Sequence, residues 1–129
     1  MTRILIAEDD PSVLKVTRLR LEHEGYEVVS ATDGEDALRQ MEAHPPIHLV
    51  LLDVKMPKMN GYQVCQRLKK NPATKHIPII VFSASKSYLT QLADQCIEIG
   101  ANDWIRKPFK TQDLLEKIRY VLEQGGDGR

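Results

Sequence analysis

Residues 49–53 read Leu-Val-Leu-Leu-Asp, and this stretch decides the fold. Four aliphatic residues in a row are too few for a helix and do not alternate with polar ones. This pattern is typical of a strand that is buried on both faces of a parallel sheet. Residues 4–7 and 77–82 have the same character, whereas 26–31 is more polar and 103–106 is short. We therefore expect five strands, with residues 26–31 and 103–106 at the edges of the sheet.

Helical patterns separate these segments. Pro11 suits the first turn of a helix that reaches residue 24, and Gly25 provides its stop signal. Acidic residues at 33–36 open a second helix, at the end where the helix dipole favours negative charge. Asn60 and Gln63 form a capping-box start for another helix, which ends near residue 71. The last helix has one apolar face, formed by Leu114, Leu115, Ile118, Val121 and Leu122.

This alternation predicts an α/β fold, a doubly wound sheet of five parallel strands with helices on both faces. The length of 129 residues suits one domain, for which we expect residues 1–123, with 124–129 as a flexible tail or linker stub. With 18 basic and 18 acidic residues the net charge is zero, so we expect no direct nucleic-acid binding. We also expect no membrane span and no signal peptide, and a cytoplasmic location.

Charged and hydroxyl side chains follow four of the five strands. The first strand is followed by Glu8, Asp9 and Asp10, the third by Asp53, the fourth by Ser83 and the fifth by Lys107. In open α/β sheets, ligands bind in the crevice outside the carboxyl ends of the strands. We therefore expect these side chains to meet at one edge of the sheet.

Each of these residues also has an ordinary interpretation. Asp10 fits well as the N-cap of the first helix, which explains Glu8 and Asp9 only in part. Asp53 fits poorly as a cap because the next helix already has Asn60. Ser83 or Lys107 alone would be a common surface residue. Their joint occurrence at strand ends favours a functional site.

Carboxylates crowded in this way need a cation. Two of them about 5 Å apart at an effective dielectric constant of about 20 repel by roughly 3 kcal/mol. Hard oxygen ligands on an open rim favour Mg²⁺, which keeps water molecules and accepts phosphate oxygens. A carboxylate beside Mg²⁺, a hydroxyl group and a lysine suits a phosphoryl group, with Asp as the nucleophile that forms an acyl phosphate.

The sequence resembles the receiver domain of two-component response regulators, a CheY-like fold, over residues 3–123. The likeness is carried by Ile-Leu-Ile-Ala-Glu-Asp-Asp at 4–10, Leu-Leu-Asp-Val-Lys-Met-Pro-Lys-Met-Asn-Gly at 51–61, Ser-Ala at 83–84 and Gly-Ala-Asn-Asp-Trp-Ile-Arg-Lys-Pro-Phe at 100–109. It implies a flavodoxin-like (βα)5 architecture with strand order 2-1-3-4-5.

The resemblance also implies roles for individual residues. Asp53 would accept a phosphoryl group from a sensor histidine kinase or phosphotransfer protein, with Ser83 and Lys107 each contacting a phosphoryl oxygen. Asp9, Asp53 and the backbone carbonyl of Lys55 would bind Mg²⁺, and Glu8 would act mainly through a metal-bound water. The Lys107–Pro108 peptide bond would be cis. Such a protein catalyses only its own phosphorylation and dephosphorylation.

The same resemblance implies a switch. Ser83 is drawn toward the phosphoryl group, and the aromatic residue three positions before the lysine, here Trp104, fills the vacated space. This changes the face formed by the fourth helix, fifth strand and fifth helix, where a downstream protein or a second copy of the chain would bind. The alternative is that Trp104 is simply a half-exposed aromatic residue of an edge strand.

This sequence departs from the family pattern at several positions. Ser83 stands where the family more often has Thr, and Trp104 where it more often has Tyr or Phe. The interval from Ser83 to Lys107 is about two residues longer than usual in the family. Lys55 and Ser85 occupy positions that tune hydrolysis of the acyl phosphate. We expect Lys55 to slow the attack of water.

Three other functions fit the fold less well. A flavodoxin-like electron carrier needs a hydroxyl- and glycine-rich loop after the first strand, where Glu8, Asp9 and Asp10 would instead repel a flavin phosphate. A metal-dependent phosphatase acting through Asp53 needs a cap domain or a substrate pocket. A receiver-like module that serves only for interaction would have lost an acidic residue or the lysine.

Overall fold

The computed structural model describes residues 1–84 and 86–124 and consists of alternating strands and helices. The strands are β1 (Arg3–Ala7), β2 (Glu27–Ala31), β3 (Leu49–Asp53), β4 (Ile79–Ala84) and β5 (Asp103–Lys107). The helices are α1 (Pro11–His23), α2 (Gly34–Ala43), α3 (Gly61–Lys70), α4 (Ser87–Glu98) and α5 (Thr111–Glu123). Ser85 and the expected tail beyond residue 124 lie outside the described residues.

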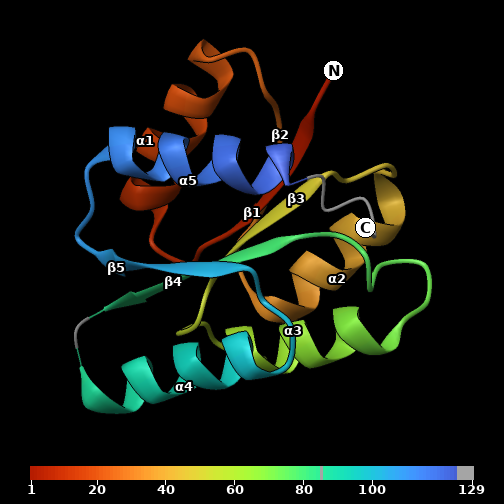
Figure 1. Cartoon of the computed structure of the whole chain (residues 1–129), viewed down its shortest axis with the longest axis vertical. Coiled ribbons are helices and arrows are strands. Elements are labelled where there is room, and N and C mark those ends of the chain that lie inside the picture. The colour runs from red at the N-terminus through yellow and green to blue at the C-terminus, as the bar shows by residue number, and fades with distance from the viewer. Residues whose placement is uncertain (85, 125–129) are drawn as a thin grey trace.

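The strands form one parallel sheet in the order β2-β1-β3-β4-β5. Figure 1 shows α1 and α5 on one face of the sheet and α2, α3 and α4 on the other. The predicted doubly wound fold, its strand order and the two edge strands are therefore confirmed. Within residues 1–84 and 86–124, none of the helices combines the length and the apolar composition of a transmembrane span.

Two apolar cores lie on the two faces of the sheet. Along β3, Leu49 and Leu51 belong to the core beneath α1 and α5, whereas Val50 and Leu52 belong to the core beneath α2, α3 and α4. All four side chains are fully buried. Successive side chains of a strand point to opposite faces, so a strand covered on both sides must be apolar throughout. This is the physical reason for the run of aliphatic residues.

The fourth strand begins and ends two residues later than the sequence pattern predicts. Pro78 has no amide hydrogen to donate to a ladder, and the amide of Ile77 is used in a turn with the Thr74 carbonyl, so the strand begins at Ile79. At the other end, Ser83 and Ala84 pair with Arg106 and Lys107 of β5. Ser83 is therefore a strand residue and not the first residue of a loop.

The helix ends follow the predicted capping residues. Asn60 Oδ1 accepts the amide hydrogen of Gln63 at 2.9 Å, and Gln63 Oε1 accepts that of Asn60 at 2.9 Å, which is the predicted capping box. Asp10 Oδ1 accepts the amide hydrogen of Ser12 at 2.9 Å. Gly25 follows α1 with a φ of 95°, the left-handed conformation in which glycine is favoured.

Candidate functional site

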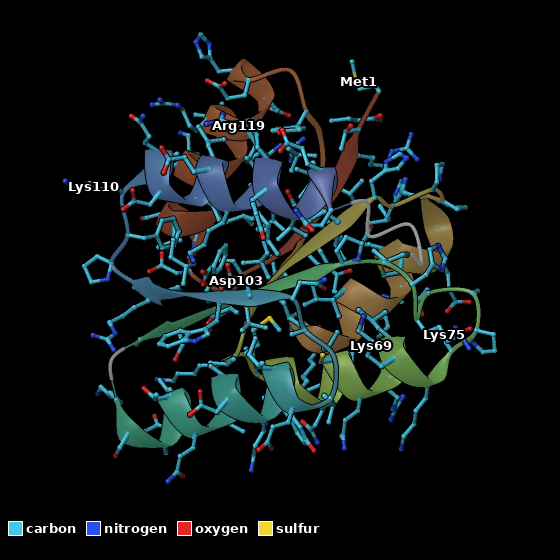
Figure 2. All side chains as sticks on the ribbon, in the orientation of Figure 1. Met1, Lys69, Lys75, Asp103, Lys110 and Arg119 are labelled. Carbon is cyan, nitrogen blue, oxygen red and sulfur yellow. The ribbon has the colours of Figure 1, made fainter. Side chains whose placement is uncertain are left out.

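Two of the side chains predicted to meet at the carboxyl edge of the sheet, Glu8 and Asp53, contact the Lys107 ammonium group. Lys107 Nζ is 2.6 Å from Glu8 Oε1 and 2.9 Å from Asp53 Oδ2. Glu8 follows β1, Asp53 ends β3 and Lys107 ends β5, so three strands contribute to one ionic cluster. In Figure 2, Lys110, just beyond β5, marks this end of the fold, while Lys69 and Lys75 lie at the other.

Three carboxylates form one face of the cluster. An oxygen from each of Glu8, Asp9 and Asp53 lies within 4.8 Å of the others. Glu8 is fully buried and Asp53 is 4% exposed, whereas Asp9 is exposed. The cluster therefore reaches solvent beside Asp9, which leaves a route for a small anion or cation to approach Asp53.

Backbone amides hold two of these carboxylates in place. Glu8 Oε2 accepts the amide hydrogen of Asp10 at 3.1 Å, and Asp53 Oδ1 accepts that of Lys55 at 3.2 Å. The side chain of Asp10 points into the first turn of α1, where it caps the helix. The capping interpretation of Asp10 is thus correct, and this residue is separate from the carboxylate cluster.

Crowding changes the acidity of the buried groups. Burial of Glu8 and its nearness to Asp53 raise the pKa of Glu8 to about 7, and Lys107 opposes this rise only in part. For Lys107, burial alone would lower the pKa, but contact with Glu8 and Asp53 holds it above its ordinary value. The acidic pair thus depends on a neighbouring positive charge to remain ionised.

The donor set fits a small hard cation. Glu8 Oε1 is buried and forms an ion pair with Lys107, but it receives no hydrogen bond of regular geometry from the described residues. The exposed Asp9 carboxylate lies beside it. Carboxylate oxygens at this spacing, open to water on one side, are the ligands that Mg²⁺ prefers.

Gly61 sets the position of Asp53 in a way that sequence reasoning missed. A Cβ atom at Gly61 would lie 2.5 Å from the carbonyl oxygen of Asp53 and 2.7 Å from the Cα atom of Val54. The first turn of α3 therefore packs directly on the backbone of the candidate phosphoacceptor. Gly34 is also closely packed, at the start of α2, where a Cβ atom would clash with the carbonyl oxygen of Met59.

The predicted switch residues lie on adjacent strands. Ser83 is fully buried, and its hydroxyl group donates to the Ala84 carbonyl at 3.0 Å rather than to Asp53. Trp104 is half-buried and packs against the core beneath α2, α3 and α4. The Arg106 guanidinium lies 5.8 Å from the centre of the Trp104 ring. The peptide bond between Lys107 and Pro108 is cis, as expected.

Comparison with known sequences identifies the family of this chain. The profile of the response regulator receiver domain matches residues 4–119. A probable transcriptional regulator ycf27 from Cyanophora paradoxa is 42% identical over 124 residues, covering 95% of this chain and 48% of that protein. The DNA-binding dual master transcriptional regulator RpaA of Synechocystis is 35% identical, covering 96% of this chain and 50% of that protein. The chain thus spans about half the length of the curated relatives it matches.

Solved structures give the same result. The signal receiver domain of a signal transduction histidine kinase from Syntrophus aciditrophicus superposes with a TM-score of 0.87 at 30% identity, covering 100% of this chain and 96% of that one. A CheY-like response regulator receiver domain protein from Methanospirillum hungatei also gives a TM-score of 0.87, at 32% identity, covering 96% of this chain and 95% of that one. From its fold and its sequence, this chain belongs to the response regulator receiver domain family.

Proposed function

We propose that Asp53 accepts a phosphoryl group from the phosphohistidine of a sensor histidine kinase or phosphotransfer protein. The observation that carries this proposal is the contact of Lys107 with both Glu8 and Asp53 beside a carboxylate cluster that opens to solvent. An aspartate that is buried among charges yet reachable from solvent is suited to covalent catalysis.

The reaction transfers a phosphoryl group between two protein side chains. A carboxylate oxygen of Asp53 forms a bond to phosphorus while the bond from phosphorus to the histidine nitrogen breaks, and the nitrogen keeps the bonding electron pair. The Lys107 ammonium, 2.9 Å from Asp53 Oδ2, balances charge on the phosphoryl oxygens. The product is an acyl phosphate on Asp53, and water later hydrolyses it.

Three carboxylates and a backbone carbonyl would hold the metal ion in this proposal. Asp9, Asp53 and the carbonyl of Lys55 would hold the ion directly, and Glu8 would act mainly through a water bound to it. When bound, Mg²⁺ supplies positive charge for the transferring phosphoryl oxygens. The support is the spacing of the carboxylates and the buried Glu8 oxygen that receives no hydrogen bond from the described residues.

Ser83 and Trp104 carry the signal away from Asp53 in this proposal. The Ser83 hydroxyl turns from the Ala84 carbonyl to a phosphoryl oxygen, and the Trp104 ring moves toward the space it leaves. Figure 1 shows β5 between α4 and α5, so this movement alters the surface that the three elements share. We assign this surface to the downstream partner and to pairing of two copies of the chain.

Several wider assignments belong to the same proposal. Residues 1–123 act as the receiver and 124–129 as a linker or tail; the chain acts in the cytoplasm and catalyses only its own phosphorylation and dephosphorylation. Its output is contact with protein and not with nucleic acid. The DNA binding named for the Synechocystis relative belongs to that protein, of which this chain spans half.

Labelling with radioactive acetyl phosphate tests the proposal. Wild-type protein should be labelled in the presence of Mg²⁺ and should lose its label with a chelator. Asp53→Asn, which keeps the size of the side chain, should not be labelled. Equal labelling of the two proteins would show that Asp53 is not the acceptor.

The lifetime of the label tests the role of Lys55. A cation beside the phosphoryl group should slow attack by water, so Lys55→Ala should shorten the lifetime relative to wild type. A wild-type lifetime of only seconds, or an unchanged lifetime in Lys55→Ala, would contradict this role. Ser85, the other residue expected to tune hydrolysis, lies outside the described residues.

A further inference from the structure

Arg106 lies where the two switch residues meet. Alternate residues of a strand face the same side, so Arg106 shares a face of β5 with Trp104. That face packs on the core beneath α2, α3 and α4, to which Trp104 contributes. In the parallel ladder, Arg106 is also the register partner of Ser83 on β4. Position 106 is therefore next to Trp104 on one face of β5 and next to Ser83 across the ladder.

The contact between Arg106 and Trp104 is a cation–π interaction. The guanidinium carbon lies 5.8 Å from the ring centre, within the usual range for such pairs. Within the described part of the chain, Arg106 makes no ion pair with a carboxylate. The indole ring is thus the group that this exposed cation contacts, and the contact favours the ring position seen in the structure.

We infer that Arg106 is a positioning residue that holds Trp104 in its resting position and so sets the threshold for the switch. The inference rests on the proposed role of Trp104 in signalling. The guanidinium contacts the ring in the position seen in the structure, and a turn of the ring toward Ser83 changes its orientation relative to the guanidinium, so this contact must be lost or rebuilt before the active arrangement forms. A contact present in only one of two states shifts the balance toward that state.

The size of the effect follows from the strength of the contact. Exposed cation–π pairs stabilise by an amount equivalent to about a two- to fivefold change in an equilibrium constant. Arg106→Gln should therefore lower the acetyl phosphate concentration that gives half-maximal labelling of Asp53 by about two- to fivefold. Arg106→Lys, which keeps a cation for the ring, should recover most of the wild-type value.

The other explanation is that the charge of Arg106 attracts the phosphoryl donor, and the sign of the change separates the two effects. If Arg106 attracts the phosphoryl donor, Arg106→Gln raises the half-maximal concentration and our inference is wrong. If Arg106 restrains Trp104, the effect of Arg106→Gln disappears in a Trp104→Leu background. An undiminished effect in that background would also overturn the inference.

Fluorescence of Trp104, the sole tryptophan, gives a direct measurement. Arg106→Gln at rest should emit more like wild type bound to beryllofluoride, a phosphoryl mimic. If wild type is not labelled at all, the proposed function itself fails. If it is labelled but its emission ignores beryllofluoride, the switch fails and this inference with it. If both respond and Arg106→Gln matches wild type, the inference alone is refuted.

Discussion

The close approach of Gly61 to the backbone of Asp53 predicts a specific defect in Gly61→Ala. The new Cβ atom would lie 2.5 Å from the Asp53 carbonyl oxygen, and real Cβ atoms essentially never lie within 3.0 Å of such an atom, so the two must separate by at least 0.5 Å. No side-chain rotation relieves the clash because the atoms that it meets belong to the backbone. Overpacking of this kind costs about 1–3 kcal/mol, and the stiffer unfolded chain returns about 0.4–1 kcal/mol.

We therefore expect Gly61→Ala to lower the free energy of unfolding by about 1–2 kcal/mol, measured by urea denaturation. The shift should also displace the Asp53 carboxylate, the proposed phosphoryl acceptor. Since misplacement by about 1 Å can cost a factor of about 100 in rate, labelling of Asp53 by acetyl phosphate should slow by about tenfold.

Gly25→Ala is the matched control. Gly25 has a φ of 95°, and a Cβ atom there would have no neighbour within 4 Å, so alanine adds backbone strain without a clash. Gly25 precedes β2 and so lies at the amino edge of the sheet, whereas Asp53 lies at the carboxyl edge. We expect a comparable loss of stability of about 1–2 kcal/mol with an unchanged labelling rate. If Gly61→Ala is as stable and as rapidly labelled as wild type, or if both variants slow equally, the proposed link between Gly61 and Asp53 is wrong.

Three further results are expected. Lys107→Met removes the ammonium between two buried acids, so without Mg²⁺ it should lower the free energy of unfolding by about 1–3 kcal/mol. If Mg²⁺ does not reduce this difference in stability between wild type and variant, the result would argue against a cation site. In calorimetry, Mg²⁺ at about 100 times its Kd for wild type should raise the free energy of unfolding of wild type by about 2.7 kcal/mol, and that of Asp9→Asn by less. Equal increases in the two proteins would exclude Asp9 as a ligand. A hydrogen bond from the Asp36 amide, and then the charge of Lys58, lower the pKa of Asp33 in the folded protein. The ionised Asp33 carboxylate therefore stabilises the fold at pH values above its ordinary, unfolded-state pKa. This stabilisation is lost as the pH falls through the pKa of the folded protein. Urea titrations should thus show that wild type is more stable than Asp33→Asn at about pH 6 but not at about pH 2. A stability difference that is the same at both pH values would refute this prediction.

The sequence was sufficient to predict the sheet and the place of the site because both depend on local patterns. Strands buried on two faces must be apolar, and the polar residues that end them must meet at one edge. Asp53 and Lys107 therefore stand out even though 54 positions separate them along the chain.

Other features depend on distant contacts that leave little local signal. Gly61 is needed because α3 begins against the backbone of Asp53, and an Asn-Gly pair at a helix start does not reveal this. The contact of Arg106 with Trp104 depends on side-chain conformations. Their spacing of two on an expected strand was the available signal, since such residues share a face.

The strand order links the candidate site to the proposed switch. Lys107 belongs to β5, and its side chain passes the end of β4 to contact Asp53 on β3 and Glu8 beyond β1. β4 ends with two small residues, Ser83 and Ala84, which leave room for the lysine to cross. A phosphoryl group on Asp53 must compete with the carboxylates for this ammonium group. Because Lys107 directly follows Arg106, the residue that contacts Trp104, a change in the ion pairs of Lys107 would act on the segment of β5 that contains the proposed switch residue.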